Sequence, residues 1–209
     1  MRNGIDCPHF WEEAKKHLFE VDETISKLIH AHEHPPLSSR DDIFLTLVRS
    51  VVGQQISSKA ADSVWDRIEG FLESVDPESV LGASLVNLRD CGLSAMKAEY
   101  IVGIAESWRS GYSDVDWNSL SDEEASTRLI RLRGVGHWTA QMILIFSLLR
   151  PDVFPVSDIG IIRSMEALYN QGHSLTESEL LTLADRWRPY RTVATWYLWR
   201  SLDPIPVNY

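Results

Sequence analysis

The feature that most constrains the fold of this chain is the spacing of its apolar residues, which recur every three to four positions along nearly its whole length. Runs of alternating β-branched residues bounded by hairpin turns, which would predict strands, do not occur in the sequence. The pattern therefore predicts an all-α protein of about eight to ten helices joined by short loops.

Local signals predict where several of these helices begin and end. A first amphipathic helix is expected over residues 11–29, and a polar break with two prolines separates it from a helix over 41–55. The last helix is expected to begin after Pro189 and to continue to residue 202. The predicted N-terminal caps are Ser57, Ser94 and two capping boxes, Ser121 with Glu124 and Thr176 with Glu179.

Length, cysteines and charge limit the classes of protein. A chain of 209 residues can bury a core without disulfides, and Cys7 and Cys91 are too few and too far apart for a disulfide framework or a four-thiolate metal site. The sequence lacks a signal-peptide pattern and any run of about 18 uncharged apolar residues, so we expect a soluble, cytoplasmic protein without membrane contact. The formal net charge of −10 argues against a generic electrostatic attraction to nucleic acid.

The stretch LRGVGHWTAQ, residues 132–141, places Gly134 and Gly136 between two helical patterns and predicts a helix–hairpin–helix. Glycines can adopt positive φ and let a polyanion approach the backbone closely. Amides at the start of the second helix suit a phosphate oxygen, so DNA could be bound through backbone groups despite the net charge. A glycine-rich connection between two packed helices would explain the same residues. Local basic charge is added by Arg128, Arg131 and Arg133.

Asp158 lies where a proline-containing loop meets the next helical pattern. One interpretation is that Asp158 caps this helix or favours its first turn. The other is that Ser157 provides the cap, which leaves the Asp158 carboxylate to point into a cleft.

Two other patterns have structural explanations. The histidines of HAHEH, residues 30–34, lack the spacing of a metal site, and we expect a solvated helix end there and no metal. The run RWRPYRTVATWYLWR, residues 186–200, interleaves arginines with aromatics, as nucleic-acid surfaces do. It is also the pattern of an amphipathic core helix with solvated arginines, and we expect both descriptions to hold.

Five pieces of the chain, in this order, have a recognisable pattern: SVVGQQIS (50–57), CGLSAMKAEYIVGIA (91–105), LRGVGHWTAQMIL (132–144), DVFPVSDIGI (152–161) and RPYRTVATWYLWR (188–200). The pattern that they form extends over roughly residues 40–201. The chain resembles the helix-hairpin-helix DNA glycosylases, in particular the 3-methyladenine DNA glycosylase II branch, which removes alkylated purines. The resemblance implies the fold of that family, with two helical subdomains flanking a cleft, and a single glycosylase unit over residues 1–209 without a separate N-terminal sheet domain.

The resemblance also implies roles for individual residues. Asp158 corresponds to the family's catalytic aspartate. The base pocket would be lined by Trp138, Trp199, Met142 and Tyr190, with Trp196 as a neighbour. The hairpin that holds the DNA backbone would comprise Leu132, Arg133, Gly134, Val135, Gly136, His137 and Thr139, and a monovalent cation would be bound by the carbonyls of Ile130, Leu132 and Val135. Aromatics at helical spacing are, however, also typical of a core, and Met142 stands where a bacterial relative has an aromatic side chain.

A flipped nucleotide leaves a gap that a side chain of the enzyme must fill. By position the wedge would be Gln55, with Gln54 beside it, although bacterial relatives often have an apolar residue there. Ile56 is an alternative wedge. The alternative is that the two glutamines are solvated residues at a helix end.

Comparison within the superfamily indicates the reaction. Bifunctional members carry a lysine two residues after the second hairpin glycine, where this chain has Trp138, and the iron–sulfur subfamily needs four cysteines. The resemblance therefore implies a monofunctional hydrolase of base excision repair, without a cofactor, that flips alkylated purines such as 3-methyladenine and 7-methylguanine out of double-stranded DNA and leaves an abasic site. We expect a monomer, associated with the nucleoid in a bacterium or nuclear in a eukaryote. The alternatives are a glycosylase for deaminated or mismatched bases and a non-catalytic helix-hairpin-helix module that binds DNA.

Overall fold

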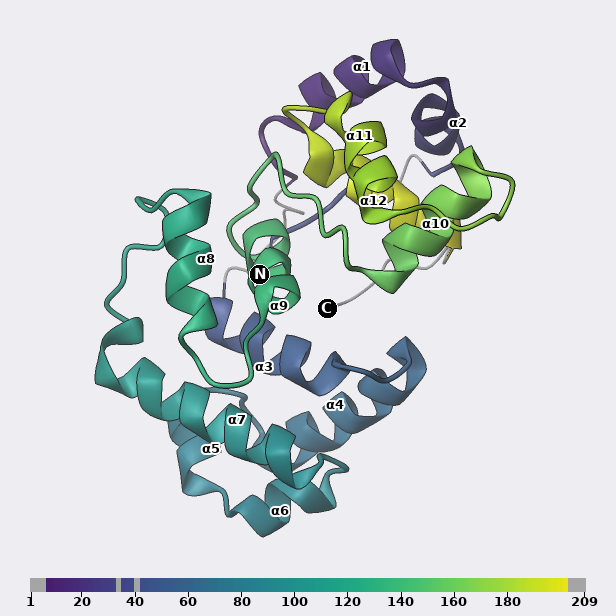
Figure 1. Cartoon of the computed structure of the whole chain (residues 1–209). Coiled ribbons are helices and arrows are strands. Elements are labelled where there is room, and N and C mark those ends of the chain that lie inside the picture. Colours follow the sequence, from purple (N-terminus) through teal and green to yellow (C-terminus); the bar gives the residue numbers. More distant parts are fainter. Residues whose placement is uncertain (1–6, 33–34, 40–41, 203–209) are drawn as a thin grey trace. The chain divides into compact units, whose positions relative to one another are not determined.

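The computed structural model describes residues 7–32, 35–39 and 42–202, and all regular elements in these residues are helices (Figure 1). The predicted all-α fold is confirmed. The predicted number of helices is too low, because the described residues form twelve α-helices and one short π-helix. No helix in this part of the chain is long and apolar enough to cross a membrane.

The chain divides into two compact units. The first unit comprises α1 (Trp11–Val21), α2 (Glu23–Ala31), α10 (Ile159–Tyr169), α11 (Glu177–Asp185) and α12 (Arg191–Leu202). The second unit comprises α3 (Ile43–Gly53), α4 (Ser58–Leu72), α5 (Pro77–Gly82), α6 (Leu85–Asp90), α7 (Ala95–Ser107), the π-helix η1 (Trp108–Tyr112), α8 (Asp122–Ile130) and α9 (His137–Phe146).

The first unit is built around α12. Every residue of this helix from Thr192 to Arg200 is buried, and α1, α2 and α10 pack against it. A helix that is enclosed on all sides buries residues all round, as α12 does. Of the arginines expected to be solvated, Arg186 and Arg188 are exposed, whereas Arg191 is half-buried and its guanidinium lies 2.6 Å from the Asp152 carboxylate.

The single helix predicted over residues 11–29 is wrong, because Asp22 separates α1 from α2. Asp22 has an extended backbone, and its Oδ1 accepts hydrogen bonds from the amides of Thr24 and Ile25. Its Oδ2 accepts hydrogen bonds from the Tyr169 hydroxyl at 3.0 Å and the Trp187 indole at 2.9 Å. Asp22 therefore caps α2 and joins it to the rest of the first unit.

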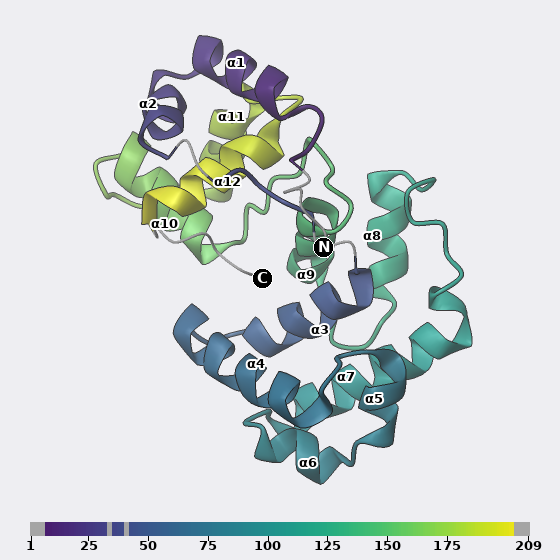
Figure 2. The ribbon, with the colours of Figure 1, turned by 180° about the vertical axis from the view of Figure 1, so that it is seen from behind.

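The second unit is built around α3, which packs against α4, α7 and α9. Leu47, Val48, Val51 and Val52 are completely buried along this helix. Figure 2 shows α7 between α3 and α6, with α5 beside it. Helices α8 and α9 pack against each other, so the hairpin that joins them is held between two packed helices.

The predicted caps are confirmed. Ser57 and Ser94 accept backbone hydrogen bonds at the starts of α4 and α7, and both capping boxes are present, at the starts of α8 and α11. The helix predicted over 41–55 is observed from Ile43 to Gly53, while residue 41 lies outside the described residues. These signals act within one helical turn, which explains why the local sequence locates them well.

Candidate active site

The predicted hairpin connects the end of α8 at Ile130 to the start of α9 at His137. Its turn is closed by a hydrogen bond from the Val135 amide to the Leu132 carbonyl, at 3.0 Å. Gly134 has a φ of +89°, in the region that glycine adopts readily. Gly136 has a φ of −97° and an extended backbone, so the expectation of positive φ is met at the first glycine and not at the second.

The hairpin packs closely against α7. A Cβ on Gly134 would lie 2.3 Å from two ring carbons of Tyr100, a residue of α7. The side chains of Leu132 and Val135 are buried, and so is that of Thr139 in the first turn of α9, whereas Arg133, Gly136 and His137 are exposed. The buried side chains therefore fix the hairpin to the second unit, while its backbone at Gly136 and the side chains of Arg133 and His137 are exposed to solvent.

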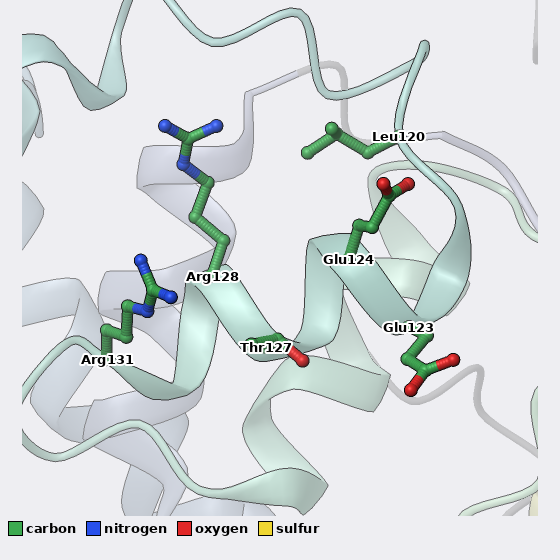
Figure 3. A pocket seen from close by; sticks show the side chains of 6 residues that line it. All are labelled: Leu120, Glu123, Glu124, Thr127, Arg128 and Arg131. Carbon is green, nitrogen blue, oxygen red and sulfur yellow. The ribbon is translucent and has the colours of Figure 1, made fainter.

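Positive charge near the hairpin is partly balanced. The Arg133 guanidinium lies 3.4 Å from the Glu99 carboxylate and over the Tyr100 ring, 5.5 Å from its centroid. Arg128 and Arg131 border a surface hollow of about 380 Å³ along α8. Figure 3 shows that the hollow is also lined by Leu120, Glu123, Glu124 and Thr127. None of the predicted site residues lines this hollow of mixed charge.

The structure separates the roles of the two adjacent glutamines after α3. The Gln54 side-chain amide donates hydrogen bonds to the Gly134 carbonyl at 3.0 Å and to Thr139 Oγ1 at 3.1 Å. The interpretation of Gln54 as a solvated residue at a helix end is therefore wrong. Gln55 is exposed with a φ of +58°, and the Ile56 side chain is 41% exposed.

Asp158 is the N-terminal cap of α10, and the prediction that Ser157 provides this cap is wrong. Asp158 Oδ1 accepts hydrogen bonds from the Ile161 amide at 2.9 Å and from the Trp199 indole N–H, also at 2.9 Å. The carboxylate is buried, with 6% of the residue exposed. The first interpretation is therefore confirmed, and the same oxygen that caps the helix also accepts a hydrogen bond from an aromatic residue of α12.

Gly160 was missed in the sequence, although it is close to this pair. A Cβ on Gly160 would lie 3.0 Å from Asp158 Oδ1 and 3.3 Å from Trp199 Cδ1. The absence of a side chain thus gives the carboxylate and the indole room to meet. An isolated glycine in the first turn of a helical pattern was the available signal.

The other predicted pocket residues have different surroundings. Trp138 is half-buried near the start of α9, and Met142, one turn later, is completely buried. Tyr190 stacks on Phe10, with ring centroids 6.3 Å apart, and the Glu13 carboxylate raises the pKa of its hydroxyl through a hydrogen bond. Tyr190 therefore packs against the segment around α1. Trp196 is buried on α12.

The described residues contain no group of three or more histidine, cysteine, aspartate or glutamate side chains that could hold a metal ion. Residues 33–34 of the HAHEH stretch lie outside the described part of the chain. At the hairpin, the Leu132 carbonyl accepts the Val135 amide, and a carbonyl oxygen has a second lone pair that can still ligate a cation.

Comparisons with known proteins identify the family. The model of the HhH-GPD superfamily of base excision DNA repair proteins matches residues 48–189, and the chain belongs to this family. The DNA-3-methyladenine glycosylase 1 of Schizosaccharomyces pombe is 32% identical over 196 residues, which cover 90% of this chain and 86% of that protein. The resemblance found in the sequence is thereby confirmed.

Solved structures give the same result. A 3-methyladenine DNA glycosylase from Schizosaccharomyces pombe, in complex with abasic DNA, matches with a TM-score of 0.81 and 32% identity, over 90% of this chain and 96% of that one. A DNA-3-methyladenine glycosidase from Bacillus halodurans matches with a TM-score of 0.75 and 32% identity, over 97% of this chain and 93% of that one.

Proposed function

We propose that this protein is a monofunctional DNA-3-methyladenine glycosylase, which binds damaged double-stranded DNA and hydrolyses the N-glycosidic bond of alkylated purines. The observation that carries the proposal is the buried Asp158 carboxylate, held by the Trp199 indole and by the first turn of α10. A protein that only bound DNA would need the hairpin, and the cap of α10 alone would not require the additional hydrogen bond from the Trp199 indole. Family membership and the relatives described above support the same reaction.

The reaction that we propose needs a negative charge at a fixed position. As the bond between the base and C1′ breaks, its electron pair goes to the base and the sugar acquires positive charge. The Asp158 carboxylate stabilises this charge, and it orients the water whose oxygen forms the new bond to C1′. The water gives up a proton to the surrounding solvent, and the products are a neutral free base and an abasic sugar.

Alkylated purines suit this chemistry because many of them are cationic before the bond breaks. The departing electron pair neutralises the base, so little help from a general acid is needed. A cationic purine is also attracted to an electron-rich ring face, by about 0.5–2 kcal/mol for each contact. We assign this contact to Trp199, which lies beside the carboxylate.

The second unit supplies the proposed DNA contacts. The backbone of the hairpin over residues 132–136 would bind a phosphate at the start of α9, where helix amides favour an anion. A monovalent cation at the carbonyls of Ile130, Leu132 and Val135 would supply positive charge to that phosphate. Gln55, exposed in the turn after α3, is the proposed wedge.

The test is release of bases from methylated duplex DNA by the wild-type protein and by Asp158→Asn, with uracil and hypoxanthine duplexes in parallel. Asparagine caps helices as well as aspartate does, and its oxygen can accept the same two hydrogen bonds, so the variant should fold normally. Without the charge, release of 3-methyladenine and 7-methylguanine should fall by at least about 100-fold. Binding to an abasic-site duplex should persist.

Each outcome has a distinct meaning. Equal activity of Asp158→Asn and wild type would refute the catalytic assignment. Release from the deaminated duplexes alone would keep the carboxylate mechanism and change the substrate class. If the wild-type protein binds DNA and releases no base, the protein is a non-catalytic DNA-binding module and Asp158 serves only as a helix cap.

A further inference from the structure

We propose that Gln54 is a positioning residue that holds the turn carrying Gln55 against the DNA-binding hairpin, so that wedge and phosphate contact keep a fixed spacing. The inference rests on the proposed function for the roles of the hairpin and of Gln55. The link between the two segments is itself a set of hydrogen bonds within the second unit.

The Gln54 side chain connects parts of the chain that are far apart in sequence. Its NH₂ group has two protons, and it donates to the Gly134 carbonyl, 80 residues away, and to Thr139 Oγ1, 85 residues away. One acceptor belongs to the hairpin and the other to the first turn of α9. A single amide thus bridges the hairpin and the first turn of α9.

Lys97 of α7 holds the backbone of the same turn. Its ammonium group donates to the Val52 carbonyl at 2.9 Å and to the Gln54 carbonyl at 2.7 Å, at the end of α3 where helical carbonyls lack intrahelical partners. Partial burial lowers the pKa of Lys97. Gln54 is therefore held through its backbone by α7 and through its side chain by the hairpin.

These contacts determine how the next residue is presented. Gln55 follows directly and is exposed. Its backbone is left-handed, a conformation that residues other than glycine rarely adopt. Ser57 then caps α4, so the turn is short and anchored at both ends. A wedge on such a turn cannot shift along the DNA independently of the hairpin.

The experiment compares wild type with Gln54→Met, which keeps the length of the side chain and removes its donors. The first probe is a duplex with a tetrahydrofuran abasic analogue next to 2-aminopurine, whose fluorescence rises when a neighbouring side chain breaks its stacking. With the variant, the fluorescence change at saturating protein should fall by at least about half, because a wedge displaced by about 1 Å loses its geometry. Affinity for the duplex should fall less.

The second probe separates positioning from a loss of overall stability. Release of 7-methylguanine paired with cytosine should be slower by about 10- to 100-fold in Gln54→Met. When 7-methylguanine lies opposite a tetrahydrofuran residue, no base pair must be broken and flipping costs less. The difference in release rate between Gln54→Met and wild type should then be several-fold smaller. Equal deficits on both duplexes, or an unchanged fluorescence signal, would overturn the proposal.

Gln171→Met is the matched control, because this exposed glutamine also has a left-handed backbone and lies outside both segments. It should behave as wild type. If Gln54→Met does not fold, Thr139→Val, which removes one acceptor, takes its place and should show the same pattern with smaller deficits. The fluorescence probe needs no base release, so a wild type that releases no methylpurine would refute the proposed function and still leave the link testable.

Discussion

Replacement of Gly134 by alanine is the sharpest test of how the hairpin is held. The new Cβ would sit 2.3 Å from Tyr100 Cγ and Cδ2 and 2.9 Å from Tyr100 Cβ. Rotation of the ring cannot relieve the contact with Cβ, so α7 or the hairpin must move. A left-handed alanine costs about 1–2 kcal/mol, and overpacking costs about 1–3 kcal/mol. Together they predict a loss of about 2–5 kcal/mol.

Thermal unfolding and DNA affinity measure the effect. For a chain of this size the loss corresponds to a fall in Tm of about 4–20 °C. Binding to an abasic-site duplex should weaken as well, because the hairpin backbone must shift. Gly136→Ala is the control for stability, since a Cβ there would meet nothing within 4 Å and φ is −97°. It should cost at most about 1 kcal/mol.

A double variant identifies the source of the loss. Combining Gly134→Ala with Tyr100→Ala removes two of the three nearest atoms, so the two substitutions should be non-additive by about 0.5–3 kcal/mol. The part of the loss due to the left-handed backbone should remain. The reasoning would be refuted if Gly134→Ala were as stable as Gly136→Ala, or if the double variant lost the full sum of the single losses.

Two further predictions concern the first unit. Trp199→Phe removes the indole donor to Asp158, so base release should fall by about tenfold or more and the free energy of unfolding by about 1–3 kcal/mol; wild-type kinetics would contradict the role of the indole. Burial and the Asp22 carboxylate raise the pKa of Tyr169. The folded state keeps this proton above about pH 10, where the unfolded tyrosine ionises, so stability should fall as pH rises past that value. In Tyr169→Phe the free energy of unfolding, measured by denaturant titration, should fall less steeply with pH above about pH 10. The same dependence on pH in both proteins would exclude Tyr169 as its cause.

Much of the helical framework was predictable because its signals are local. The caps of α4, α7, α8 and α11 depend on residues within one turn, and apolar periodicity needs only the neighbouring residues. The hairpin was located by two glycines between helical patterns. Family membership was also predictable, because the order of five motifs along the chain can be read without knowledge of the tertiary structure.

The sequence failed where a residue had more than one possible partner. Asp22 interrupts an amphipathic pattern, and its carboxylate also accepts hydrogen bonds from Tyr169 and Trp187, which are distant in the chain. Likewise, Ser157 and Asp158 are both good capping residues by type. The indole of Trp199, 41 residues later, shares the oxygen with which Asp158 caps α10.

The sequence by itself determined the helices, the hairpin and the residue types available for chemistry. Only the tertiary structure decided that Gln54 joins the hairpin while Gln55 is exposed, and that Gly160 makes room for the pair of Asp158 and Trp199. The physical reason is the range of the interactions. Periodicity and capping act over a few residues, whereas the direction of a polar side chain depends on donors and acceptors that folding brings close from far along the chain.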